Sequence, residues 1–271
     1  MNNEIDEITQ RINSNGGMLW SRSDGNIYSP IGFSSIEVLN VFGDMGLRYN
    51  THQTTKSLCD FIVTRFDNKS GLFSYSASSS KLPCVSAKIL SSLFKVEYPH
   101  QEIFSIAANK LVTSQANDGG WRCSTVKIGK APETDASNPG TTLYVLDFLR
   151  NFPEIVDIVE EQSVNFLLNH WETKKPLGPC EFGIGSTFLK TEYPLIRYNI
   201  LYYVFTLSHF DRAKNDSRFR NAVSVLLDKK EDGHLRIENP HKKWKPILFP
   251  DDRSFSEYSD NLVKEIERNL A

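Results

Sequence analysis

Apolar positions in this chain recur with the period of an α-helix, and the same pattern returns along the sequence. When the similar segments are aligned, one apolar column contains Leu39, Leu90, Leu146 and Val204, at intervals of 51, 56 and 58 residues. A second apolar column follows three residues later, with Phe42, Leu93, Leu149 and Leu207. Apolar residues at i and i+3 in a segment of roughly four turns indicate one buried helix face. The pattern therefore predicts a buried helix that is repeated several times.

A glycine-containing turn precedes each repeated helix. The turns are Gly16-Gly17-Met18-Leu19-Trp20, Gly71-Leu72-Phe73, Gly119-Gly120-Trp121, the diverged Gly178-Pro179-Cys180-Glu181-Phe182, and Gly233-His234-Leu235. Glycine allows a positive φ where a preceding helix stops, and the aromatic residue or leucine that follows is expected to fold back over that helix end. A hydroxyl also recurs four residues before the first apolar column, at Ser35, Ser86 and Thr142, with Ile200 as the exception.

These signals predict a single all-α domain over residues 1–271, built of five helical pairs. The repeats lie near 4–50, 51–98, 101–152, 155–210 and 216–270. Their helices are predicted at 4–13 and 34–47, 54–65 and 85–96, 103–114 and 141–151, 156–169 and 195–210, and 217–229 and 256–269. The only stretch with the period of a strand is short, at 234–237.

The loops inside the pairs are longer than the loops between them. Helical hairpins usually have connections of about 2–8 residues, whereas the loops inside these pairs run to about a dozen or more. Long loops gathered at one end of a helical stack commonly carry function. The alternative is that they only decorate a repeat protein.

The third repeat carries a recognisable motif. The segment Gln115-Ala116-Asn117-Asp118-Gly119-Gly120-Trp121 resembles the QxxxGxW repeat of squalene and oxidosqualene cyclases, whose helical hairpin also occurs in protein prenyltransferase β-subunits. The resemblance implies an α/α toroid, a barrel of about five helical hairpins whose inner helices line an apolar central cavity. It also implies structural roles for Gln115, which can bond a helix end, and for Trp121, whose indole stacks over it.

The catalytic motifs of that superfamily have no counterpart in this chain. The Asp-x-Asp-Asp acid of the cyclases is absent, and the nearest carboxylate pair is Asp251-Asp252. The Asp-x-Cys pair and His that bind zinc in the prenyltransferases are also absent from the corresponding helix starts. We therefore expect no cofactor and no metal, and leave catalysis open. Convergence of Cys123, Cys180 and His209 on a metal stays possible in space but has no support from their spacing.

Composition narrows the range of partners and locations. Of the 271 residues, 39% are apolar and 24% charged, and the formal net charge is −2, which does not favour nucleic acid. The four cysteines are widely spaced, as expected for thiols in a reducing cytoplasm. The acidic and polar start of the sequence is unlike a secretory signal, and the longest apolar run, 198–210, is too short to cross a bilayer. We expect a cytoplasmic protein without a transmembrane segment, and make no prediction of its oligomeric state.

The third and fourth repeats contain the candidate ligand-binding residues. These are Arg122, Cys123, Asp135, Cys180, Glu181, Glu192, Arg197, Tyr198 and Tyr202. Pro194 suits a first helical turn, which would place Arg197 near a helix N-terminus, where anions bind. Tyr198 and Tyr202, four residues apart, would then share one helix face. An aromatic wall with one cationic corner suits an apolar chain that ends in a phosphate or an acid.

Other interpretations of these residues remain open. Glu192 and Arg197 can be an ion pair that fixes the helix start, and the tyrosines can belong to the core. Three classes of function are therefore considered. The first is a protein that binds an isoprenoid-like or other apolar ligand, with or without transforming it, as prenyl or terpenoid enzymes do. The second is a non-catalytic lipid-binding or protein-interaction module. The third is a carbohydrate-active barrel, which would need two opposed carboxylates, with Asp135 and Glu181 as the only candidates.

Overall fold

Helices dominate the protein, as the sequence predicts. The structure, a computed structural model, describes residues 2–123, 135–178, 180–250 and 254–271. Its internal contacts divide the chain into two compact units. The N-terminal unit contains Met1–Lys110 and His241–Asp252, and the C-terminal unit contains Leu111–Pro240 and Arg253–Ala271. None of the helices in the described ranges is both long and apolar enough to span a bilayer.

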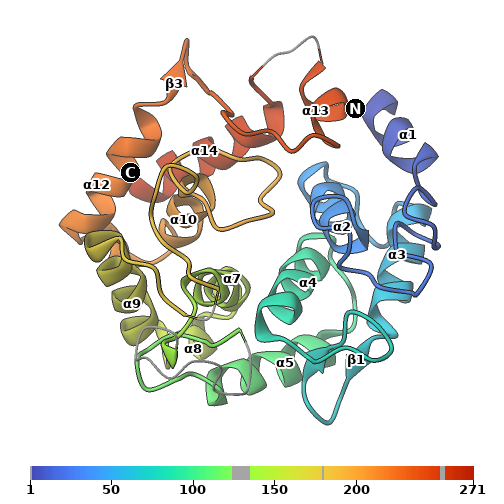
Figure 1. Ribbon diagram of the computed structural model, residues 1–271, viewed down its shortest axis with the longest axis horizontal. Coiled ribbons are helices and arrows are strands. Elements are labelled where there is room, and N and C mark those ends of the chain that lie inside the picture. The colour runs from blue at the N-terminus through green and yellow to red at the C-terminus, as the bar shows by residue number, and fades with distance from the viewer. Residues whose placement is uncertain (1, 124–134, 179, 251–253) are drawn as a thin grey trace. The chain divides into compact units, whose positions relative to one another are not determined.

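The N-terminal unit is built around two adjacent buried helices, α2 and α4 (Figure 1). Its elements are α1 (Asn2–Gln10), α2 (Ser35–Asp44), α3 (Gln53–Val63), β1 (Phe66–Asp67), β2 (Leu72–Phe73), α4 (Pro83–Lys95) and α13 (Lys245–Leu248), and α5 (Gln101–Thr113) begins in it. The helix α3 packs on α2, and α1 packs on α13. The two short strands form an antiparallel hairpin in which Phe66 pairs with Phe73.

The C-terminal unit has α10 at its centre, in contact with α7, α12 and α14. Its elements are α7 (Pro139–Leu149), α8 (Pro153–Val156), α9 (Glu160–Thr173), α10 (Ile200–Leu207), α11 (Asp211–Lys214), α12 (Ser217–Leu227), β3 (Lys230–Glu231), β4 (His234–Leu235) and α14 (Glu257–Leu270). Every residue of α7 and of α10 is buried, whereas α9 and α12 bury one face each. The strands β3 and β4 form a second antiparallel hairpin.

The predicted burial of the apolar columns is confirmed, while some helix boundaries differ from the prediction. All eight residues of the two columns have no exposed surface. The helix expected at 156–169 is divided into α8 and α9, and the strand expected at 234–237 is only two residues long. The hairpin of β1 and β2 was not predicted, because strands of two residues leave no periodic pattern.

The start of α10 is a correction with consequences for the site. The sequence suggested a helix from 195, with Pro194 in its first turn, but α10 begins at Ile200. Asn199 is the N-cap, and its side-chain oxygen accepts hydrogen bonds from the amides of Leu201 and Tyr202, at 3.0 and 3.2 Å. An N-cap asparagine satisfies amides that have no partner within the helix, so it fixes the helix start. Arg197 and Tyr198 therefore precede the helix.

The recurring hydroxyls connect the buried helices to the glycine turns. Ser35 Oγ donates to the carbonyl oxygen of Leu19 at 2.7 Å. Ser86 Oγ accepts from the amide of Phe73 at 2.9 Å, and Thr142 Oγ1 accepts from the amide of Trp121 at 3.0 Å. Each bond joins a buried helix to its own turn, so the hydroxyl column has a local structural cause.

The glycine turns have the conformation that the sequence predicts. In all five turns one glycine has a positive φ, between 67° at Gly71 and 90° at Gly119. The indole of Trp121 donates from Nε1 to the carbonyl oxygen of Leu111, near the end of α5, at 2.7 Å. Gln115 Nε2 donates to the carbonyl oxygen of Gly119 at 2.9 Å. Trp121 therefore holds the turn against the preceding helix, whereas Gln115 bonds within the turn and, at 3.2 Å, to the carbonyl oxygen of Val159, the N-cap of α9.

Replacing Thr142 with valine is expected to destabilise the protein by about 1–3 kcal/mol. Valine keeps the shape but leaves the buried amide of Trp121 without its acceptor. Urea denaturation of the two proteins measures the difference. Thr173→Val is the matched control. The hydroxyl of Thr173 bonds the backbone carbonyl oxygen of Asn169, but this bond is exposed to solvent. An equal effect of the two substitutions would contradict a specific role for the hydroxyl column.

Candidate functional site

Four of the predicted site residues lie on two loops, one that precedes α7 and one that follows α9. Arg122 Nη2 and Asp135 Oδ2 form an ion pair at 3.3 Å. The thiols of Cys123 and Cys180 are within hydrogen-bonding reach of each other. Burial, together with the neighbouring Cys123, raises the pKa of Cys180 to about 11. Glu181, next to Cys180, is exposed and has a positive φ of 49°.

The two loops pack together at the N-terminus of α7. Gly178 lies so close to the preceding loop that a Cβ atom there would be 3.2 Å from the Cα of Asn138. Asn138 is the N-cap of α7 and accepts from the amide of Thr141 at 2.8 Å. Ser137 donates to the Asp118 carboxylate from both its amide and its hydroxyl, at 2.7 and 2.6 Å. These contacts give the loops a fixed base beside the glycine turn.

Glu192 and Arg197 form a close ion pair before α10. Arg197 Nε lies 3.0 and 3.1 Å from the two carboxylate oxygens, and its Nη2 lies 2.6 Å from Oε2. Asn239 Nδ2 donates to the same Oε2 at 3.0 Å. Glu192 has 4% of its side chain exposed but Arg197 has 52%. The hydrogen bonds with Glu192 are the main reason that the pKa of Arg197 is raised.

Tyr198 and Tyr202 do not form one helix face, contrary to the sequence prediction. Tyr198 precedes α10, and its hydroxyl contacts His170 Nδ1 at 2.9 Å. Tyr202 lies in the first turn of α10, and its hydroxyl donates to Asp147 Oδ2 at 2.9 Å. Because the helix starts at Ile200, the spacing of four residues does not place the two rings one above the other.

Tyr144 on α7 connects three of the predicted residues, and sequence reasoning missed it. Its ring centroid is 5.5 Å from that of Tyr202. Burial chiefly raises the pKa of Tyr198 and of Tyr202, and Tyr144 contributes electrostatically to both. Tyr144 also helps to raise the pKa of Arg197 electrostatically, although the hydrogen bonds with Glu192 are the largest cause. The three tyrosines are 4–6% exposed. Tyr144 and Tyr202 each stand two residues before the apolar column. This shared position is the signal in the sequence that could have identified Tyr144.

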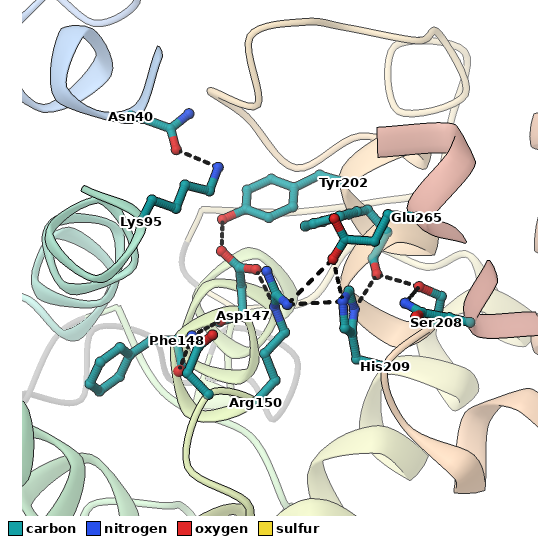
Figure 2. Close-up of polar contacts among 12 residues, drawn as sticks. Asn40, Lys95, Asp147, Phe148, Arg150, Tyr202, Ser208, His209 and Glu265 are labelled. Carbon is teal, nitrogen blue, oxygen red and sulfur yellow. Dashed lines mark hydrogen bonds and ion pairs between the residues drawn. The ribbon is translucent and has the colours of Figure 1, made fainter. Parts of the chain in front are cut away.

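Figure 2 shows a charged cluster, in the C-terminal unit, that the sequence did not reveal. Arg150 Nε donates to Asp147 Oδ1 at 2.9 Å, and Arg150 Nη1 lies 2.9 Å from His209 Nε2. The same nitrogen of His209 lies 2.9 Å from Glu265 Oε1. The hydrogen bond with His209 is the main cause that lowers the pKa of Glu265. Together with Tyr202, this cluster joins the C-terminal ends of α7 and α10 to α14.

The N-terminal unit has a polar cluster at the equivalent place in its own helices (Figure 2). Lys95 Nζ donates to Asn40 Oδ1 at 2.9 Å and to Asp44 Oδ1 at 2.8 Å. Asn40 and Asp147 both directly follow the apolar column, and Lys95 ends α4. A polar residue at that place in an otherwise buried helix is the signal that could have predicted both clusters.

Glu37 is a buried carboxyl group in the first turn of α2. Its Oε2 accepts from the amide of Ser34 at 3.0 Å, in a capping box. Its Oε1 has no hydrogen-bond partner among the described residues. Burial raises the pKa of Glu37, and the nearby Lys88 partly opposes this shift. Glu37 and Lys88 stand two residues before the apolar column, as Tyr144 and Tyr202 do in the other unit.

A groove with a volume of about 630 Å³ runs along α9. Its lining includes the amide side chains of Asn117, Gln162, Asn165 and Asn169, and the ring of Phe166. Amides offer both donors and acceptors, so the groove can bind a polar ligand. Tyr198 is not among the residues that line this groove, and its ring packs against that of Phe188, with centroids 4.7 Å apart.

Metal binding finds no support in the described ranges, where no three His, Cys, Asp or Glu side chains are arranged to hold an ion. His209 contacts Arg150 and Glu265. The pair Asp251-Asp252 lies outside the described residues. No protein-family model matches the chain, and no curated protein matches it either. The case for function therefore rests on the chain's own geometry.

Proposed function

We propose that the protein is an α/α toroid of the prenyltransferase and squalene cyclase superfamily, formed as one domain. The support is local. The QxxxGxW segment uses Gln115 and Trp121 to hold its turn, and five glycine turns share a positive φ. The hydroxyl bond between turn and buried helix recurs in three repeats. Recurrence of one small structural unit is what a repeat architecture requires.

Its function, in this proposal, is to bind an isoprenoid-like ligand with an anionic head group beside Arg197. The observation that carries the proposal is the environment of that arginine. Its Nε and Nη2 are held by a buried carboxylate, while 52% of the side chain is exposed. A guanidinium that is fixed on one edge loses little conformational entropy when the ligand binds. Arg197 Nη1 makes no hydrogen bond to any residue that the structure describes, so it can donate to an anion.

The apolar part of the ligand is assigned to Tyr144 and Tyr202. The centroids of the two rings lie 5.5 Å apart, and Tyr144 helps to raise the pKa of Arg197 electrostatically. Binding through one edge of the guanidinium gives one or two charge-assisted hydrogen bonds, rather than the fork that an unpaired arginine offers. We propose binding rather than catalysis, because the acid and zinc motifs of the superfamily have no counterpart in the sequence.

Replacing Arg197 with methionine is expected to weaken the binding of farnesyl diphosphate by about tenfold, the loss of one charge-assisted bond. Farnesol has the same chain without the charge, so its binding is expected to change little. Titration calorimetry measures both ligands. Arg236→Met is the matched control, because Arg236 is 53% exposed and paired with Glu231 in the same unit.

Three results would count against this function. Equal binding of farnesyl diphosphate by the wild-type protein and the Arg197→Met variant would remove Arg197 from the site. A loss of stability without a loss of binding would leave Glu192 and Arg197 as a structural ion pair. Binding of neither farnesyl diphosphate nor farnesol to the wild-type protein would reject an isoprenoid-like ligand altogether.

A further inference from the structure

We propose that Cys123 and Cys180 form a reversible disulfide that joins two loops of the C-terminal unit. The loops are the one that follows the Trp121 turn and the one that follows α9. This inference is independent of the ligand proposed above. It assigns a covalent modification to two residues that the sequence suggested only as ligand-binding or metal-binding groups.

The two cysteines stand two residues after Trp121 and Gly178, and both of these residues lie against Asn138. The Asn138 amide donates to the carbonyl oxygen of Trp121 at 2.9 Å, and a hydrogen bond with Cys123 is among the causes that raise the pKa of Cys180. Gly178 packs on the backbone of Asn138, and Leu177 forms an antiparallel bridge with Phe182 around Cys180. On the other side, Trp121, two residues before Cys123, is fixed by its bond to Thr142. A disulfide needs Cα atoms within about 7 Å of each other, which the packing of both loops against Asn138 favours.

Exposure also distinguishes this pair from the other cysteines. Cys180 is exposed and Cys123 is half-buried, so an oxidant can reach them. Cys59 is fully buried in α3, and burial raises its pKa to about 12. Cys84 lies in the first turn of α4. Cys59 and Cys84 belong to the N-terminal unit, whereas Cys123 and Cys180 both belong to the C-terminal unit.

The chemistry needs an oxidant, and a peroxide is sufficient. The thiolate of Cys123 attacks one oxygen of hydrogen peroxide, which forms a sulfenic acid and releases hydroxide. The Cys180 sulfur then displaces the hydroxyl group from the sulfenic sulfur, and the Cys180 proton leaves with it as water. In total, two thiols and one peroxide give one disulfide and two waters. The same balance holds if the thiolate of Cys180 attacks first.

The experiment oxidises the full-length, fully reduced protein with hydrogen peroxide. We expect the intact mass to fall by two hydrogen atoms, and proteolysis to release one peptide pair joined through Cys123 and Cys180. Dithiothreitol should reverse both changes. The oxidised protein should also melt higher, by roughly 5 °C or more, because the bond closes a long loop in the unfolded chain.

Three variants make the test specific. Cys123→Ser and Cys180→Ser should each abolish the loss of hydrogen and the melting shift, whereas Cys84→Ser should keep both. Addition of oxygen to the cysteines without a cross-link would overturn the proposal, as would a cross-link that includes Cys59 or Cys84. Release of stoichiometric zinc from the reduced protein, lost in Cys180→Ser, would also overturn it, because the thiols would then be metal ligands.

Discussion

Replacing Trp121 with alanine is expected to destabilise the protein by about 3–5 kcal/mol, the range for a large aromatic residue in a packed core. The side chain is 1% exposed. Its removal leaves a cavity beside the turn, and it also takes the indole donor away from the carbonyl oxygen of Leu111. That carbonyl also accepts from the amide and the hydroxyl of Ser114, at 3.1 and 2.9 Å, so the cavity is the larger part of the loss.

Urea denaturation of Trp121→Ala and Trp121→Phe separates the two contributions. Phenylalanine fills most of the space but has no N–H, so we expect it to cost about 0.5–1.5 kcal/mol, the net contribution of one hydrogen bond, because the Leu111 carbonyl oxygen keeps its bonds from Ser114. Binding of farnesyl diphosphate, measured on the folded variants, should be unaffected. Full stability together with lost binding would move Trp121 from the scaffold to the ligand site.

The second large effect is expected at Asp147, in the charged cluster of Figure 2. Its carboxylate is 4% exposed and accepts from both Arg150 and Tyr202. Asp147→Ala leaves the half-buried Nε of Arg150 and the buried hydroxyl of Tyr202 without their acceptor. Loss of one partner from a buried ion pair typically costs about 3–5 kcal/mol.

A double variant tests whether the unpaired charge is the cause. Asp147→Ala combined with Arg150→Met removes the charge as well as its partner, so it should be more stable than Asp147→Ala alone. Urea denaturation at neutral pH gives both values. A cost below about 1 kcal/mol for Asp147→Ala would mean that water already reaches the pair, as it does for surface ion pairs.

Sequence reasoning predicted the features that depend on neighbours in the chain. The helices follow from apolar residues three and four positions apart, and the Gly119 turn follows from the need for a positive φ. The pairing of Glu192 with Arg197 was also foreseen as an alternative, since the two are only five residues apart. Each of these interactions is local, so the sequence contains enough information for it.

The remaining features depend on distant segments. Glu192 also binds Asn239, and Tyr202 binds Asp147, across separations of 47 and 55 residues. No pattern of spacing predicts which distant side chain will approach. The start of α10 was missed for a different reason. Two local signals compete there, Pro194 and Asn199, and the asparagine prevails because it satisfies two helix amides with one oxygen.

The hydroxyl that joins turn and helix has a consequence for how such a chain can change. A hydroxyl both donates and accepts, and the repeats use both abilities, since Ser35 donates to a carbonyl whereas Ser86 and Thr142 accept from amides. The peptide group in the turn can therefore present either its carbonyl oxygen or its amide to the helix hydroxyl, and a hydrogen bond still forms. In the fourth repeat the hydroxyl is absent, and the backbone amide of Ile200 bonds the carbonyl oxygen of Phe188 at 2.8 Å instead. A connection of this kind tolerates substitutions in the residues around it. Each turn is therefore a suitable place to graft or exchange loops.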